Sequence, residues 1–223
     1  MTDQAAGLRR RAARLATRAV MVFSASPQSA PRLAEALHAH GPVVLLIDTQ
    51  DRQFSDSARN LFGWRQQLER GQALTLPMSY GAGWRAPGAR LDEPALAALA
   101  RRYDLVVVDA APDIPELVLM PGATHLAAIE VQASVESLHY AYRLVKTLAQ
   151  RPAVAGVGLF GDPAACARVL AASGNFLAAA FSDTVCSVAA ETDAFAALAV
   201  RMSAEEGRLT AFYNKGANPN HGR

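Results

Sequence analysis

The chain has 223 residues, which suits one α/β domain and is too short for two ordinary domains with a linker. Hydrophobic residues make up 51% and charged residues 19%, so the composition excludes a disordered tail and predicts a buried core. The formal net charge is +2, but residues 1–18 hold five arginines and one aspartate, so this N-terminal arm carries +4 and the rest carries −2. A nearly neutral body with a basic arm does not predict a specific nucleic-acid partner.

Targeting and metal signals are absent from the sequence pattern. No apolar run approaches the roughly 20 residues of a bilayer-spanning helix. The arginines of the arm are not followed by the apolar stretch of a secretory signal, which predicts a cytoplasmic protein. Cys166 and Cys186 lack a CxxC spacing, and the five histidines show no ligand spacing. We therefore expect no metal site, and we expect both cysteines to be buried thiols.

Strands and helices alternate along most of the chain. The arm has apolar residues at helical spacing, which predicts a short amphipathic helix ahead of the domain. Strands are expected at 20–23, 43–47, 105–108, 126–131, 154–160 and 177–181, and helices at 31–40, 55–70, 92–102, 137–150 and 163–172. Continuous β-branched strands predict a sheet covered on both faces. The expected fold class is α/β with a doubly wound, mostly parallel sheet, divided into the arm (1–18), one domain (19–213) and a polar tail (214–223).

This order of parts resembles the MinD/ParA-type P-loop ATPases. The matching pieces include Leu45-Leu-Ile-Asp48 and Tyr103-Asp-Leu-Val-Val-Val-Asp109. Asp3-Gln4-Ala5 followed by Leu8-Arg9 resembles the DQAxxLR signature of FlhG, the MinD-like regulators of flagellar number and position. A stretch with Ser137, Ala141, Tyr142 and Lys146 is similar to a helix of the same family, although core packing alone accounts for Tyr142. The resemblance spans roughly residues 2–185 and implies a P-loop NTPase fold.

The phosphate-binding loop of that family has no counterpart in the sequence. The family's Gly-Lys-Gly-Gly-Val-Gly-Lys-Thr is replaced by Ala25, Ser26, Pro27, Gln28, Ser29, Ala30, Pro31 and Arg32. Glycines let successive N–H groups face the phosphates, and a lysine reaches the β and γ oxygens. Two prolines remove N–H donors here, and both lysines are lost. Arg32 stands at the position of the Mg²⁺-binding hydroxyl, where it puts a cation in the metal's place. It could bind an anion, but a surface arginine at a helix start is the commoner case.

The acidic residues of the family site are also incomplete. Asp48 and Asp109 stand where the family keeps metal-associated aspartates, but the second acid of its Asp-x-Asp element is Gln50 here. Without that carboxylate and the loop, phosphoryl transfer lacks its machinery. We therefore expect a decayed nucleotide site and no cofactor. Asp48 and Asp109 are predicted to be structural, capping loop N–H groups at the strand ends.

The resemblance implies a regulatory protein and not a catalyst. The family's arm engages the signal-recognition-particle-type GTPase FlhF and stimulates its GTP hydrolysis. By the same resemblance, Asp3 and Gln4 reach the partner's nucleotide site, and Leu8 and Arg9 anchor the helix beside Ala5. Further expected partners are flagellar switch or basal-body components or a flagellar transcription regulator, with recruitment to the cell pole. The alternatives are a solvated arm, a scaffold for polar secretion, pilus or cellulose machinery, and an active MinD/ParA-type ATPase.

The C-terminal region bears on membrane binding, because family members carry a basic amphipathic helix there. An apolar stripe is formed by Phe195, Leu198, Met202, Leu209 and Phe212. Residues 187–213 nevertheless have a net charge of −2. An acidic helix is repelled by anionic lipid, so we expect no strong membrane binding and predict that the stripe packs on the body or on a partner.

Overall fold

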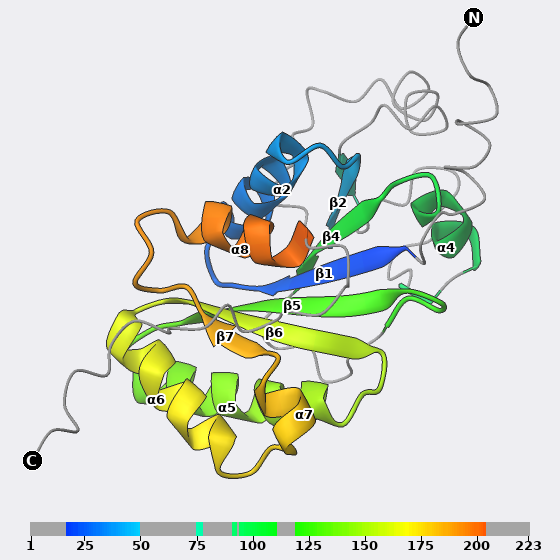
Figure 1. The fold of residues 1–223 in the computed structure, drawn as a ribbon. Helices are drawn as coiled ribbons and strands as arrows, with labels where there is room; N and C mark the ends of the chain where they lie inside the picture. Colours follow the sequence, from blue (N-terminus) through cyan, green and yellow to red (C-terminus); the bar gives the residue numbers. More distant parts are fainter. Residues whose placement is uncertain (1–16, 50–74, 78–90, 93, 111–118, 204–223) are drawn as a thin grey trace, which may run out of the picture.

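The protein is described by a computed structural model, which covers residues 17–49, 75–77, 91–92, 94–110 and 119–203 (Figure 1). The strands are β1 (Arg18–Phe23), β2 (Val44–Asp48), β3 (Thr75–Pro77), β4 (Leu105–Ala110), β5 (Thr124–Val131), β6 (Val154–Gly161) and β7 (Val185–Ser187). The helices are α2 (Ser29–Ala39), α4 (Pro94–Ala100), α5 (Val135–Ala149), α6 (Pro163–Gly174), α7 (Ala179–Ser182) and α8 (Ala194–Ser203).

All strands of the described ranges belong to one seven-stranded sheet, in the order β3-β2-β4-β1-β5-β6-β7. Every strand pair in it is parallel. The strand β1 lies in the middle, between β4 and β5, and its five residues from Ala19 to Phe23 are buried. Parallel strands buried on both faces read as continuous apolar runs, which is why they were recognisable in the sequence.

Helices cover both faces of the sheet (Figure 1). On one face, β1 residues Val20 and Val22 form an apolar cluster with Leu33 of α2 and Leu198 of α8. On the other face, the alternate β1 residues Met21 and Phe23 belong to a second apolar cluster. Three further helices contribute to this cluster, with Leu96 of α4, Val145 of α5 and Val169 of α6. The α/β class with a doubly wound, parallel sheet is therefore confirmed.

Local capping explains where two of the helices begin. The Ser134 hydroxyl accepts a hydrogen bond from the Ser137 N–H at 3.1 Å, at the start of α5. The Asp162 carboxylate accepts one from the Ala165 N–H at 2.7 Å, at the start of α6. Both bonds satisfy N–H groups that have no partner within a helix. The turns after β5 and β6 are thereby fixed at the carboxyl edge of the sheet.

The strand predicted at 177–181 is wrong. The short helix α7 lies there, and the last strand follows it as β7. Three consecutive alanines precede Phe181, and alanine favours a helix over a strand. The N–H of Leu177 also donates to the Ser173 carbonyl at 3.0 Å, which continues the helical path beyond α6. A strand of three residues is too short to show a period of its own.

Some expectations fall outside the described residues. They are residues 2–16 of the helix expected at 2–18, the whole helix expected at 55–70 and the polar tail. The β1 strand begins at Arg18, inside the arm as the sequence delimited it. Within the part of the chain that the structure describes, no helix has both the length and the apolar character needed to span a bilayer.

Candidate functional site

The candidate site lies at the carboxyl edge of the sheet, between β1 and β5. The chain leaves β1 through α2 toward β2 on one side, and it leaves β5 through α5 toward β6 on the other. Adjacent parallel strands whose connections diverge leave a crevice between them, where α/β folds bind ligands. In this protein the β1–α2 turn, which the sequence places where the resembled family has its phosphate loop, follows β1 at this edge.

The N–H groups of the β1–α2 turn donate to acceptors within the turn and the first turn of α2. The Ser26 N–H donates to the Ser24 hydroxyl at 3.0 Å, and the Ser29 N–H donates to the Ser26 carbonyl at 3.3 Å. In the first turn of α2, the Arg32 N–H donates to the Gln28 carbonyl at 3.0 Å. Pro27 and Pro31 have no N–H to offer. The backbone donors that a phosphate would require are therefore largely missing or already bonded.

The residues of this stretch differ in burial. Ser29 and Ala30 are buried beneath the turn, and Ser26 and Pro31 are half-buried. The exposed members are Ala25, Pro27, Gln28 and Arg32. Gln28 occupies the N-cap of α2, and its side chain makes no capping hydrogen bond. The buried polar groups of the turn therefore come from serines, which bond to the protein itself.

A polar cluster joins the turn to β5. Phe23 pairs in register with Ile129, so the next residues, Ser24 and Glu130, are also neighbours across the two strands. The Ser24 hydroxyl donates to the Glu130 carboxylate at 2.5 Å. The hydroxyl oxygens of Ser24 and Ser29 lie 2.8 Å apart. A carboxylate thus lies beside the β1–α2 turn, at the carboxyl edge of the sheet.

Two further carboxylates lie on the same face of the sheet. Asp48 and Asp109 pair in register on β2 and β4, and both are buried. Alternation along the strands puts Asp48 on the face of Leu46 and Asp109 on the face of Val107, toward α2 and α8. The Thr49 hydroxyl donates to the Asp109 backbone carbonyl, which fixes the chain as it leaves β2. The capping role predicted for the two aspartates stays a prediction.

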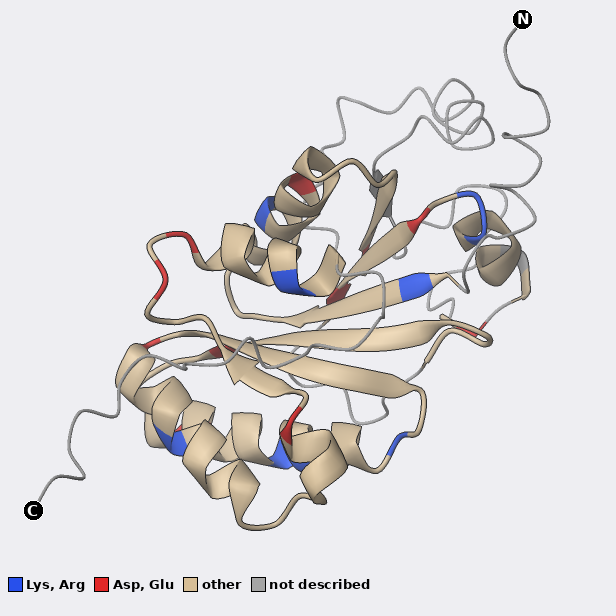
Figure 2. Ribbon diagram, in the orientation of Figure 1, with Lys and Arg blue, Asp and Glu red and all other residues tan. Residues whose placement is uncertain are grey.

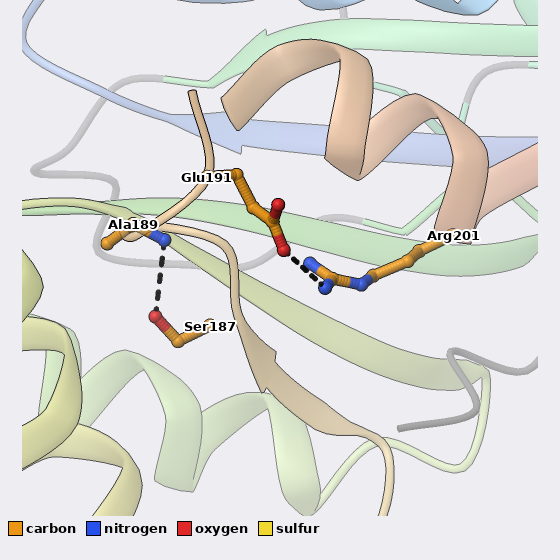
Figure 3. Close-up of polar contacts among 4 residues, drawn as sticks. All are labelled: Ser187, Ala189, Glu191 and Arg201. Atoms are coloured by element: carbon orange, nitrogen blue, oxygen red, sulfur yellow. Dashed lines mark hydrogen bonds and ion pairs between the residues drawn. The ribbon is translucent and has the colours of Figure 1, made fainter. Parts of the chain in front are cut away.

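The surrounding loops add more negative charge to this edge. Asp162 follows β6, and Glu191 and Asp193 lie between β7 and α8. Figure 2 shows the acidic positions of the described chain in red. The guanidinium of Arg201, in α8, pairs with the Glu191 carboxylate of the β7–α8 loop at 3.1 Å (Figure 3). The Ala189 N–H in that loop donates to the hydroxyl of Ser187, the last residue of β7, at 3.4 Å. The Glu191 charge is therefore compensated by Arg201, and the Asp162 carboxylate is used as the cap of α6.

Arg32 does not stand as a free cation over this edge. Its side chain is exposed, and the guanidinium carbon lies 4.5 Å from the centroid of the Phe195 ring in α8. Arg32 is thus an exposed residue in the first turn of α2, and its predicted role stays a prediction. Its interaction with an aromatic ring is a cation–π contact that the sequence pattern did not indicate.

The predicted partner-binding residues lie outside the described residues, as does Gln50. They are Asp3, Gln4, Ala5, Leu8 and Arg9. The members that the structure brings together are the β1–α2 turn, Asp48 and Asp109. Ser24 and Glu130 were missed from the sequence. The signal for Glu130 was an acid within the apolar strand at 126–131, one position past the residue that pairs with Phe23.

Two other expectations can be compared with the structure. Phe195, Leu198 and Met202 are buried against the sheet, which confirms for these three that the stripe packs on the body; Leu209 and Phe212 lie outside the described residues. Cys166 and Cys186 are free and buried, as predicted. Among the residues that the structure describes, no group of three or more His, Cys, Asp or Glu side chains could hold a metal ion.

No known family model matches the chain, and no curated protein sequence matches it significantly. The parallel strands in the order β2-β4-β1-β5-β6-β7, with helices on both faces of the sheet, are consistent with a Rossmann-like or P-loop-type fold. The fold class rests on this topology.

Proposed function

We propose that the protein is a non-hydrolysing FlhG-like regulator of flagellar number, position or assembly, which binds an FlhF-type GTPase through its N-terminal arm and stimulates GTP hydrolysis. It acts as a pseudo-ATPase with a decayed phosphate loop, without a nucleotide cofactor. Asp3 and Gln4 reach the partner's nucleotide site, and Leu8 and Arg9 anchor the arm. A glutamine amide can orient a water molecule, and an arginine can pair with a phosphate or a carboxylate.

The observation that carries the non-hydrolysing half of this proposal is the hydrogen bonding of the β1–α2 turn. Its N–H groups at Ser26 and Ser29 bond to the turn itself. The neighbouring Glu130 carboxylate accepts from Ser24. A nucleotide would have to break these bonds and would bring its phosphates beside a carboxylate, with no lysine in the turn to compensate.

The partner half of the proposal is supported by the sequence of the arm. The Asp3-Gln4-Ala5 and Leu8-Arg9 pattern matches the DQAxxLR signature, and the +4 charge of residues 1–18 is concentrated beside it. A short arm that folds against its partner suits a regulated contact. In keeping with the resemblance, we place the protein in the cytoplasm, with recruitment to the cell pole by a partner. Flagellar switch, basal-body or transcription-regulator proteins are the further candidates.

The proposal is tested by GTP turnover of an FlhF-type GTPase. The reaction is run with the intact protein, with the Gln4→Ala variant and with a chain that lacks residues 1–16. This deletion stops before β1, which begins at Arg18, so it leaves the sheet intact. Stimulation by the intact protein alone supports the proposal. Equal turnover in all three reactions contradicts it and favours the polar scaffold, which would not need the arm.

Nucleotide binding is tested separately by calorimetry with Mg-ATP and with Mg-ADP. No heat of binding is expected. A micromolar dissociation constant that is lost in Asp48→Asn or Asp109→Asn would contradict the pseudo-ATPase and favour an active ATPase.

A further inference from the structure

We propose that Glu130 holds the β1–α2 turn in its observed conformation through hydrogen bonds, so that the turn is ordered without any ligand. The inference concerns the fold and not the partner. It holds or fails whether or not the arm stimulates a GTPase.

The first step is the direction of the hydrogen bonds. A carboxylate can only accept, so the Ser24 hydroxyl donates its single hydrogen to Glu130 across 2.5 Å. The Ser29 hydroxyl, 2.8 Å from the Ser24 oxygen, then donates to that oxygen. The Ser26 N–H donates to the same oxygen at 3.0 Å. The Ser24 hydroxyl thus donates one bond and accepts two, and the Ser26 carbonyl oxygen lies 3.4 Å from it.

The second step is what these bonds connect. Glu130 lies on β5, Ser24 follows β1, and Ser29 is the first residue of α2. Ser24 and Ser29 are buried, so their hydroxyls need partners inside the protein. One carboxylate therefore ties the central strand, the turn and the first residue of α2 to the neighbouring strand. Hydrogen bonds to a charged group are stronger than those between neutral groups.

The third step concerns helix capping. The helix α2 has no side-chain cap at Gln28, and its first turn contains no acidic residue. In a ligand-binding turn, an anion at this end would satisfy the helix N-terminus and order the turn. Here the order comes from the Glu130 contact through Ser24 and Ser29. Glu130 thereby holds the turn through the hydroxyls of Ser24 and Ser29, whereas an anion would bind the N–H groups directly.

The test is amide hydrogen exchange of the full chain, read at Ser26, Ser29 and Arg32. Their N–H groups all donate within the turn or the first turn of α2. Glu130→Ala should raise their exchange rates by roughly tenfold or more relative to the rest of the domain, since losing a bond to a charged group favours local opening by at least that factor. Glu136→Ala is the matched control, because Glu136 is an exposed acid in the first turn of α5.

A conservative variant and a double variant distinguish a local effect of Glu130 on the turn from a general loss of stability. Glu130→Gln keeps an acceptor oxygen, so it should restore most of the protection. The effects of Ser24→Ala and Glu130→Ala should sum to more than the effect of the double variant, because both single changes remove the bond between these two side chains. Unchanged exchange in Glu130→Ala, or a rise spread evenly over the domain, overturns the proposal. So does slower exchange at these amides when Mg-ATP is added to the wild type, because the turn would then be completed by a ligand.

Discussion

Arg32 and Phe195 join the two helices that cover one face of the sheet. The Arg32 guanidinium lies over the Phe195 ring, with its central carbon 4.5 Å from the centroid. The same ring contacts Phe160 of β6 at a centroid distance of 5.4 Å. An exposed arginine at the start of α2 is thus linked through α8 to the sheet. Arg32 therefore connects the first turn of α2 with α8.

The contribution of this contact can be measured by urea unfolding. Arg32→Ala should lower the free energy of unfolding by about 0.5–1 kcal/mol, the usual value of a cation–π contact at an exposed site. Arg32→Lys should retain part of it, because an ammonium group also binds an aromatic face. Arg168→Ala serves as the control, since Arg168 is an exposed arginine of α6. An equal effect of the Arg32 and Arg168 changes to alanine would contradict the role of the ring.

Gly161 should be sensitive to substitution. It ends β6 with a φ of +111°, and a Cβ there would lie 2.5 Å from the Val131 carbonyl oxygen. Gly161→Ala is expected to lower the free energy of unfolding by about 2–4 kcal/mol, because backbone strain and a clash with backbone both contribute. Gly174→Ala is the control, because Gly174 ends α6 with nothing within 4 Å of its added Cβ. Thermal or urea unfolding that does not distinguish the two variants would be evidence against this account.

The central strands could be predicted because each is a continuous apolar run between polar ends. Val154–Gly161 was expected almost to the residue, since a strand buried on both faces leaves a strong local pattern. The strand at Val185–Ser187 could not be predicted, because three residues are too few to show the alternation of a strand. The alanines before it also suggest a different element.

The candidate site was predicted in part. The β1–α2 turn, Asp48 and Asp109 follow apolar strands, and parallel topology brings such positions to one edge. The bond from Ser24 to Glu130 joins residues that are 106 positions apart. Only the strand order makes them neighbours, and no local pattern encodes that order. The contact of Arg32 with Phe195 was missed for the same reason.

His125 gives the protein a defined dependence on pH. It is buried in β5, and its Nε2 accepts the Met120 N–H at 3.0 Å, so the ring is neutral with its proton on Nδ1. Burial lowers the pKa of His125, and backbone contacts with Ala123 and Ala153 act in the opposite direction. Below the unfolded-state pKa of about 6.5, the unfolded chain binds the proton more readily than the folded protein does. Stability should therefore fall as the pH falls from 6.5 toward the lower folded-state value.

Unfolding free energies at pH 7.5 and 5.5 test this expectation. In the wild type, His125 should lower the unfolding free energy by at most about 1.4 kcal/mol for each pH unit below 6.5. The decrease should be smaller in His125→Gln, which keeps an acceptor without a titrating ring. His139→Gln, which changes an exposed histidine of α5, is the matched control variant. An identical pH dependence in the His125 variant would show that another group is responsible.

The two cysteines should be unreactive in the folded protein. Burial raises the pKa of Cys166 to about 11, with a Ser187 hydrogen bond acting against the shift and Asp162 adding to it. Burial also raises the pKa of Cys186, and Arg201 opposes that shift. Because the thiolate is the reactive form, both thiols should react slowly with a disulfide reagent at pH 8. Two thiols should react after unfolding in guanidinium. Rapid labelling of the native chain would contradict this prediction.

The arm supplies the prediction that bears most directly on function. If Gln4 orients water at the partner's nucleotide site, Gln4→Ala should leave binding nearly intact and remove the stimulation of GTP turnover. If Leu8 is the buried anchor, Leu8→Ala should weaken binding by about 1.5–3 kcal/mol, the contribution of one buried aliphatic side chain. Arg9→Ala should lose affinity mainly at low salt, because a partly exposed charge contact is screened as the ionic strength rises.

A peptide of residues 1–20 tests whether the arm is sufficient, since the whole signature lies within it. It should stimulate GTP turnover in part, and a peptide with Gln4→Ala should not. The matched control is Gln28→Ala in the full chain, which changes an exposed glutamine of the β1–α2 turn and should leave stimulation unchanged. If the Gln4 and Gln28 variants stimulate equally, a water-orienting role for Gln4 is excluded. If neither the peptide nor the full chain binds the partner, the arm is a solvated tail, and the polar scaffold becomes the better explanation for the folded body.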